Sequence, residues 1–424
     1  MRAYLAFIRD NAPFLAVGAL LFFLSSFGQT FLIAIFAGEI RAEFALSNGD
    51  WGLLYMGATA ASATVMIFAG ALTDRFRVRT LGVAVLGLLA IACLGMALNQ
   101  SVLGLVLIVF CLRLFGQGMT SHTAATAMAR WFSATRGRAL AIATVGFVLA
   151  EAALPLFSAW IKTILPWRHV WVGFGCFILL MMPLIWHLLR YERTPQSVAK
   201  TDSTPGMDGR HWTRAEAIRY PLFLTILPAM TLFPMFATTF FFHQVHFAEI
   251  KGWSHIALVA VFPLGTFTLM ASTFLFGWAI DRFGASRLLL IYLLPYSVAF
   301  VIHAYAPTIT WAALGVILMG LAGGGQATLP VTTWSTYFGT AHIGAIKAVS
   351  TAVMVFGSAI GPGLSGWLID VGVGLERQLL IYAVTFVLAS GAMIVPLRRA
   401  NARLTDRGDS PVQAGGGPGK ITGT

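Results

Sequence analysis

The sequence predicts an all-α membrane protein of twelve transmembrane helices, arranged as two six-helix bundles. Three observations support this prediction: charged residues are scarce, apolar residues gather in runs of transmembrane length, and the second half of the chain repeats features of the first. Of the 424 residues, 58% are hydrophobic and 10% are charged, whereas a soluble domain usually carries about 25% charged residues. So few charges could not cover the surface of a soluble protein.

The apolar runs have the length of membrane-spanning helices. A run of about 20 residues crosses roughly 30 Å of hydrocarbon, because an α-helix rises about 1.5 Å per residue. The runs lack the period-two alternation that a transmembrane β-barrel requires. The predicted spans are 13–37, 51–72, 80–98, 102–127, 138–161, 169–189, 220–243, 255–279, 287–305, 308–334, 344–369 and 377–397.

The basic residues predict the orientation of the chain. With the amino terminus in the cytoplasm, 22 of the 28 Lys and Arg residues fall in cytoplasmic segments and five fall outside. This excess is the positive-inside bias of membrane proteins, so we expect a multi-pass protein of the plasma (inner) membrane with both termini cytoplasmic. The net charge of +12 then reflects orientation and attraction to anionic lipid headgroups, and we expect no nucleic-acid partner.

One long polar stretch divides the chain. Residues 190–219 are rich in charged residues, Gly and Pro, a composition typical of linkers. We therefore expect an amino-terminal bundle at 1–189, a cytoplasmic linker at 190–219 and a carboxy-terminal bundle at 220–399. The Gly-rich end, 400–424, is expected to be a disordered cytoplasmic tail.

The two halves are related by an internal repeat. A shift of 207 residues brings nine identical residues together. In the first half they are Gly70, Asp74, Arg75, Phe76, Gly116, Gly118, Gly137, Pro155 and Trp160. In the same order they align with Gly277, Asp281, Arg282, Phe283, Gly323, Gly325, Gly344, Pro362 and Trp367. Parallel repeats of this kind build transporters whose substrate site lies between the halves near the membrane midplane.

The repeated segments resemble known motifs. Residues 70–79 closely resemble the loop motif of the major facilitator superfamily, 277–284 repeat it, and 113–118 are similar to the helix 4 motif of that superfamily. The resemblance implies alternating-access transport of a small solute. It also implies a gating role for five charged residues, Asp74, Arg75, Arg79, Asp281 and Arg282. The alternative is that these loops only set the membrane topology. We expect a monomer without cofactor or metal, and no enzyme, because the spans hold no paired catalytic groups.

A further resemblance concerns the substrate. Residues 129–141 are similar to the loop between helices 4 and 5 of monocarboxylate-transporter-like and oxalate/formate-antiporter-like members. This implies transport of a small organic anion as substrate, with a monocarboxylate carried by symport with protons. The predicted eighth span departs from those groups, since it has no Arg or Lys. The alternative is efflux of drugs or metabolites by proton antiport, although the Gly-Pro motif expected for it in the fifth span is absent.

Two charged residues stand within the predicted spans. Arg113 and Glu151 both lie near the middle of their runs, where a charge costs about 2.5–3.5 kcal/mol on insertion scales. Three hypotheses remain open. The two residues form a structural ion pair; or Arg113 binds an anionic substrate while Glu151 takes up a proton; or Glu151 alone pairs with a cationic substrate.

Helical spacing gives these charges polar neighbours. At about 100° per residue, Gln117 and Thr120 share the stripe of Arg113, and Thr144 and Ser158 share that of Glu151. The candidate substrate-binding residues are Arg113, Gln117, Gln29, Gln326 and His243, and the candidate proton-coupling residue is Glu151. The span 220–243 contains Pro221, Pro228 and Pro234, which are expected to bend or break it because proline lacks an amide donor.

Overall fold

The computed structural model describes residues 7–132, 135–190 and 205–405, without the side chains of Asp74, Arg136 and Thr405. All regular structure in these ranges is helical. Eleven helices are long and apolar enough to span a membrane, and the bent pair Ala12–Gly28 and Thr30–Phe44 provides the twelfth span. The predicted all-α fold of twelve spans is therefore confirmed.

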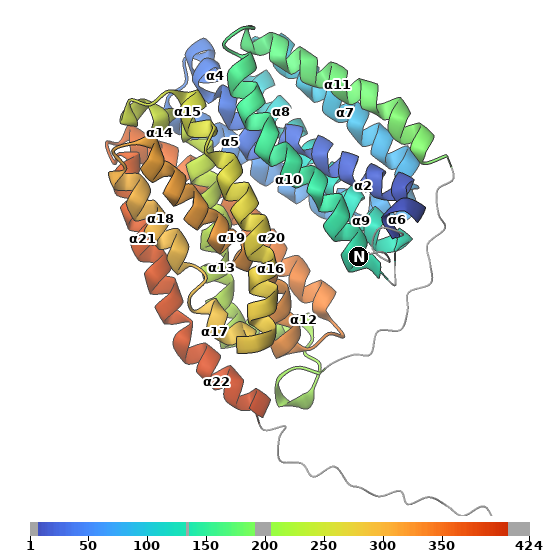
Figure 1. The fold of residues 1–424 in the computed structure, drawn as a ribbon, viewed down its shortest axis with the longest axis vertical. Coiled ribbons are helices and arrows are strands. Elements are labelled where there is room, and N and C mark those ends of the chain that lie inside the picture. The colour runs from blue at the N-terminus through green and yellow to red at the C-terminus, as the bar shows by residue number, and fades with distance from the viewer. Residues whose placement is uncertain (1–6, 133–134, 191–204, 406–424) are drawn as a thin grey trace, which may run out of the picture.

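The helices form two groups that lie side by side (Figure 1). The first group contains α2 (Ala12–Ser25), η1 (Ser26–Gly28), α3 (Thr30–Ile33), η2 (Ala34–Phe36), α4 (Ala37–Phe44), α5 (Asn48–Ala69), α6 (Leu72–Arg75), α7 (Val78–Leu98), α8 (Val102–Cys111), η3 (Leu112–Thr120), α9 (Ser121–Trp131), α10 (Arg136–Ile161) and α11 (Trp167–Leu188).

The second group contains η5 (Met207–Gly209), α12 (Arg214–Arg219), α13 (Pro221–Phe242), α14 (Gln244–Lys251), α15 (His255–Val259), α16 (Phe262–Phe283), α17 (Ala285–Leu289), α18 (Leu294–Tyr305), α19 (Ile309–Phe338), α20 (Ile343–Asp370), α21 (Leu375–Ala392) and α22 (Ile394–Thr405). We call the end at which α4, α14 and α15 lie the distal end, and the end at which α6, α12 and α22 lie the terminal end (Figure 1).

The first span is longer than predicted. It was expected to end at residue 37, but helix continues to Phe44 after a break. The added residues carry acidic side chains that are paired at the distal end, Glu39 with Lys162 at 2.8 Å and Glu43 with Arg168 at 2.5 Å. These ion pairs compensate charges that lie beyond the apolar run.

The prolines of α13 do not break it. The helix runs unbroken from Pro221 through Pro228 and Pro234 to Phe242, so the prediction that these prolines break the span is wrong, while a bend there stays a prediction. Pro221 occupies the first helical turn, where a missing amide proton costs nothing. The break lies instead in the first span, at Gln29, whose backbone is extended at φ −85° and ψ 150°.

The predicted linker and tail are partly ordered helix. Residues 191–204 and 406–424 lie outside the described residues, but α12 begins at Arg214 and α22 continues to Thr405. Trp212 is 4% exposed and packs against Tyr220 and Phe338. Glu216 closes a capping box with the backbone amide and hydroxyl of Thr213, and these bonds lower the pKa of Glu216 to about 2. The end of the linker is thereby fixed to the second bundle.

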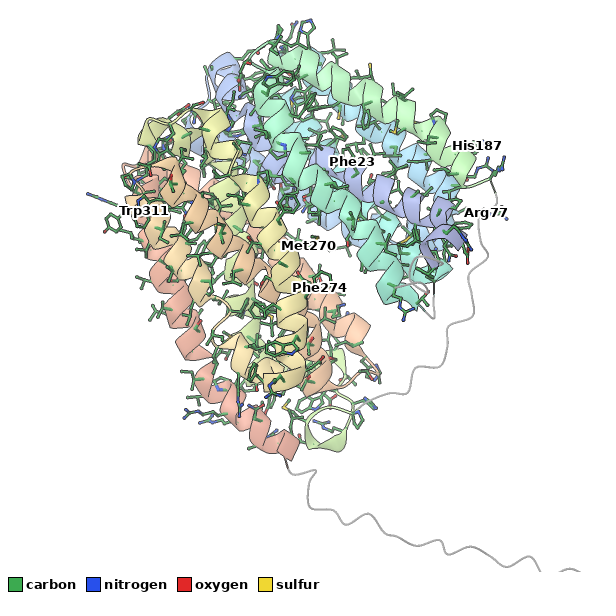
Figure 2. All side chains as sticks on the ribbon, viewed as in Figure 1. Phe23, Arg77, His187, Met270, Phe274 and Trp311 are labelled. Atoms are coloured by element: carbon green, nitrogen blue, oxygen red, sulfur yellow. The ribbon has the colours of Figure 1, made fainter. Side chains whose placement is uncertain are left out.

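The two bundles contact each other mainly through α5 against α20 and α10 against α16. Their outer surfaces stay apolar, as expected where lipid replaces water. Phe274 and Trp311, for example, project from the second bundle with 75% and 51% of their surface exposed (Figure 2). The inner faces of α10 and α16 therefore lie where a site between the two bundles would be.

The orientation is open to a direct labelling experiment. In a background without Cys93, Cys111 and Cys176, we introduce one cysteine at exposed Ala215 on α12, or at exposed Thr163 after α10. The charge bias predicts that the terminal end is cytoplasmic. An impermeant maleimide should therefore label position 163 in intact cells and position 215 only after permeabilisation. If position 215 were labelled in intact cells as strongly as after permeabilisation, the predicted orientation would be wrong.

Candidate functional site

A cavity of about 450 Å³ lies between the two bundles. Its walls come from α3, η3 and α10 on one side and from α13, α16, α18, α19 and α20 on the other. The polar and charged residues of its lining are Gln29, Thr30, Arg113, Gln117, Glu151, Thr238, Thr266, Tyr296, Gln326, Thr351 and Ser358. Both charges of this lining therefore belong to the first bundle.

The break at Gln29 exposes backbone groups to this cavity. Since Gln29 is extended, the Gly28 carbonyl has left the helical ladder and accepts a hydrogen bond from Arg113 Nη1 at 3.1 Å. Glycine is the residue type that fits at position 28. A Cβ atom at this position would lie 2.0 Å from the carbonyl oxygen of Leu112, so the close approach of the two helices requires glycine.

The segment that carries Arg113 is a π-helix. It spans Leu112–Thr120, and the Thr120 hydroxyl donates to the Phe115 carbonyl five residues earlier at 2.6 Å. Such wide turns are rare and occur often at functional sites. The wide turn changes the angle per residue, so Arg113, Gln117 and Thr120 do not all share one face. Arg113 and Gln117 line the cavity, but Thr120 does not.

Arg113 is held by neutral partners. The side chain is 2% exposed, and Nη1 donates to the Gly28 carbonyl and, at 3.2 Å, to the Thr30 hydroxyl. Thr30 is in turn 2.5 Å from the Tyr55 hydroxyl. Nε of Arg113 has no hydrogen-bond partner among the described residues. The positive charge thus lies at the cavity wall without a carboxylate beside it.

Glu151 lines the cavity from α10. Its carboxylate lies near the Thr266 hydroxyl of α16 in the other bundle, and that hydroxyl is 3.5 Å from the Phe262 carbonyl of its own helix. Within the described residues no ion pair joins Arg113 to Glu151. The hypothesis of a structural ion pair therefore has no contact to support it in this conformation.

The polar stripe predicted around Glu151 is only partly correct. Neither Thr144 nor Ser158 lines the cavity. The hydroxyl of Thr144 donates to the Ala141 carbonyl of its own helix at 3.0 Å, and Ser158 is fully buried. Equal spacing along a helix gives a common direction, but only the middle of α10 passes the cavity.

Three glutamines were proposed for substrate binding, and all three line the cavity. For Gln29 and Gln117, no hydrogen bond joins the carboxamide to another of the described residues. Gln326 differs: its Nε2 donates to the Met230 carbonyl at 3.3 Å, and its Oε1 accepts from the Tyr292 hydroxyl at 3.2 Å. Pro234 cannot bond that carbonyl, so Gln326 replaces the missing amide and supports α13.

His243 lies away from the cavity. It follows the last residue of α13, is 3% exposed, and its Nε2 is 3.2 Å from the Pro362 carbonyl of α20. This position belongs to the distal contact between helices and lies outside the cavity lining, so a role of His243 in substrate binding stays a prediction.

Aromatic walls are the part of the cavity that sequence patterns did not indicate. They comprise Phe31, Phe147, Phe233, Phe241, Phe262 and Tyr296. With 33 phenylalanines in the chain, a ring that faces the cavity has the same local sequence signature as one that faces lipid. The one usable signal is the spacing of Phe147, which stands one turn before Glu151 on the same face of α10.

The cavity is closed toward the distal end. The Gly49 amide at the start of α5 donates to the Asp370 carboxylate at the end of α20 at 2.9 Å, and Gln244 Nε2 donates to the Phe31 carbonyl at 3.2 Å. The rings of Trp51 and Phe242 stack with centroids 5.6 Å apart. These contacts join the two bundles and separate the cavity from the distal face.

The predicted gating residues lie at the terminal end, where α6 and α17 are found (Figure 1). Arg75, Asp281 and Arg282 are exposed. The guanidinium of Arg79 lies 3.9 Å above the ring centroid of Trp186 in the same bundle. The side chain of Asp74 lies outside what the structure describes.

Two helical bundles that enclose a central cavity with charged residues in its wall, in the middle of apolar spans, have the architecture of a membrane transporter. The Major Facilitator Superfamily model matches residues 18–278. The chain belongs to this superfamily, and it is a transporter.

Similar proteins extend this comparison. A stretch of 93 residues is 32% identical to the "Multidrug resistance protein B homolog" from two strains of Mycobacterium tuberculosis, and the match spans 22% of this chain and 17% of that relative. A bacterial homolog of the human lysosomal transporter Spinster, inward-facing and unoccupied, shares the fold with a TM-score of 0.68 and 18% identity over 95% of this chain and 99% of that one. A mutant of the nucleoside transporter NupG aligns with a TM-score of 0.63 and 13% identity over 92% and 99%.

Proposed function

We propose that this chain carries an organic carboxylate across the plasma membrane together with a proton, by alternating access and as a monomer. Arg113 binds the carboxylate and Glu151 carries the proton. The observation that supports this proposal is that two opposite charges line one cavity without pairing with each other. If the pair only stabilised the fold, direct contact would compensate both charges, because an uncompensated buried charge is costly.

Substrate and proton can be coupled through these two residues. A carboxylate at Arg113 brings a negative charge into the cavity that Glu151 lines, and like charges near each other favour protonation of one of them. The loaded transporter then carries no extra net charge across the membrane. Asp74, Arg75, Arg79, Asp281 and Arg282 are proposed to stabilise the closed state of the terminal end, and both termini are proposed to be cytoplasmic.

Replacement of Arg113 by glutamine tests the proposed anion site. Charge-assisted hydrogen bonds contribute about 1.5–3 kcal/mol, so Arg113→Gln should weaken carboxylate binding by about 10- to 150-fold. Binding is measured as thermal stabilisation of the purified protein by propionate, glutarate and 3-phenylpropionate, since a ligand of the native state raises its stability. Arg287→Gln, which removes an exposed charge on α17, serves as the control. Equal binding in both variants would remove Arg113 from the site.

Proton-coupled efflux of drugs or metabolites is the second candidate. It is favoured by the similarity to the multidrug resistance protein B homolog and by the apolar rings of the cavity. In proteoliposomes, symport moves a carboxylate along with an imposed proton gradient, whereas antiport moves a cationic or neutral drug against it. The direction of flow relative to the proton gradient therefore separates the two.

A further inference from the structure

We infer that the transported acid has a single carboxylate attached to an aromatic body, so that its charge lies at Arg113 and its ring lies between the phenylalanines of the two bundles. The inference rests on the proposed function and narrows it. It favours aryl-substituted monocarboxylates over short fatty acids, dicarboxylates and sugar acids.

The charges of the lining limit the substrate to one carboxylate. Arg113 is the single Lys or Arg among the described residues that line the cavity. A dicarboxylate would place its second negative charge among apolar groups or near Glu151, where no cation compensates it, and such a charge is strongly disfavoured. Oxalate-like substrates therefore fit this cavity poorly.

The size of the cavity indicates that the carboxylate is attached to a larger body. A volume of about 450 Å³ falls in the range of pockets that hold drug-sized ligands. A water molecule takes about 30 Å³ in the liquid, so an acid of two or three carbons would leave most of this space to water. The apolar walls gain nothing from water, whereas an apolar body that displaces it binds favourably.

Rings from both bundles surround this space in edge-to-face pairs. Phe31 and Phe147 of the first bundle have centroids 6.0 Å apart at 77°. In the second bundle Phe241 and Phe262 lie 5.2 Å apart at 85°, and Phe233 lies 4.7 Å from Tyr296 at 62°. Aromatic pairs prefer such tilted arrangements, so an aryl group of the substrate finds ring edges and faces on both sides.

Part of the polar lining of the second bundle is already hydrogen-bonded. Gln326 bonds Met230 and Tyr292, the Ser358 hydroxyl donates to the Val355 carbonyl at 2.7 Å, and the Thr266 hydroxyl is 3.5 Å from the Phe262 carbonyl. A sugar acid would lose its hydration in this cavity and would need a partner for each of its hydroxyl groups. An aromatic body requires none.

Matched probes test the inference by thermal shift and by competition in proteoliposomes with the full chain. The reference probe is 3-phenylpropionate. Propionate lacks its ring, glutarate has a second carboxylate instead of the ring, and 3-phenylpropionamide lacks the charge. We expect 3-phenylpropionate to reach half-saturation at a concentration at least about tenfold below the other three.

Three substitutions at two positions of α10 test the aromatic wall, and one of them is the control. Phe147→Ala should weaken binding of 3-phenylpropionate at least about threefold, because it removes a ring from the wall, and Phe147→Leu should do the same while preserving apolar volume. Neither should change binding of propionate. Phe157→Ala removes a ring that faces away from the cavity and is 46% exposed, and it should change neither probe.

The outcomes separate this inference from the proposed function. If propionate or glutarate binds more tightly than 3-phenylpropionate and this binding still depends on Arg113, the inference of an aromatic substrate is wrong. The proposal of carboxylate transport is then unaffected. Binding of the amide equal to that of the acid, and insensitive to Arg113→Gln, overturns both. No stabilisation by 3-phenylpropionate at about 10 mM, where a site with a Kd of 1 mM would be mostly filled, also overturns the aromatic substrate.

Discussion

Replacing Glu151 with glutamine is expected to abolish proton-driven accumulation and to leave substrate exchange intact. The amide mimics the protonated acid in shape and cannot release a proton. With one proton carried per anion, a gradient of one pH unit sustains about a tenfold concentration ratio, because both correspond to about 1.4 kcal/mol. In proteoliposomes of Glu151→Gln this ratio should fall to unity, while exchange of labelled for unlabelled substrate continues.

The control for this experiment is Glu249→Gln at the distal end, where an exposed carboxylate is removed away from the central cavity. It should accumulate substrate as the unsubstituted protein does. Retained tenfold accumulation by Glu151→Gln would show that another group carries the proton. Loss of exchange as well as accumulation would assign Glu151 to substrate binding, as the hypothesis of a cationic substrate requires.

The double variant Arg113→Ala/Glu151→Gln distinguishes these roles from a structural pair. If the charges stabilised each other, each single variant would strand a buried charge at a cost of about 3–5 kcal/mol, and the double variant would recover expression. Since Arg113 donates to Gly28 and Thr30, and no ion pair joins it to Glu151 among the described residues, we expect no such recovery. The double variant should lose both binding and accumulation.

Composition and charge predicted most of the fold. The bilayer demands long apolar helices whatever the tertiary packing, so the predicted spans 169–189 and 308–334 correspond closely to Trp167–Leu188 and Ile309–Phe338. The same demand makes a charge inside a span conspicuous. Both Arg113 and Glu151 could therefore be selected from the sequence, and both line the cavity.

The detail of the site depends on contacts that no local pattern contains. The first span breaks at Gln29, without a proline, where Gly28 meets the Leu112 carbonyl of a helix far along the chain. The widened turn at Leu112–Thr120 shifts Thr120 away from the stripe predicted for a regular helix. Conversely, α13 stays unbroken at Pro234 because Gln326 supplies the missing donor from α19. Each difference comes from packing between helices.

Closure of the distal end depends on the absence of a side chain at Gly52, where α5 meets α20. A Cβ atom on Gly52 would lie 2.6 Å from the Pro362 carbonyl oxygen and 3.2 Å from the Cα atom of Gly363. Both are backbone atoms, which cannot move aside as a flexible side chain does. Since alternating access requires these faces to separate in the outward-open state, a methyl group at Gly52 should disfavour only the closed arrangement.

Gly52→Ala is therefore expected to shift the transporter toward the outward-open state. Overpacking costs about 1–3 kcal/mol, which corresponds to a change of about 5- to 150-fold in the equilibrium, while the substitution itself favours helix. With a single cysteine at Thr238, which lines the cavity, an impermeant maleimide should label the variant from outside at least about fivefold faster. Gly57→Ala is the matched control on the same helix, because a Cβ atom there meets nothing within 4 Å. Equal labelling rates for the two variants would mean that the contact of Gly52 with Pro362 does not hold the distal end closed.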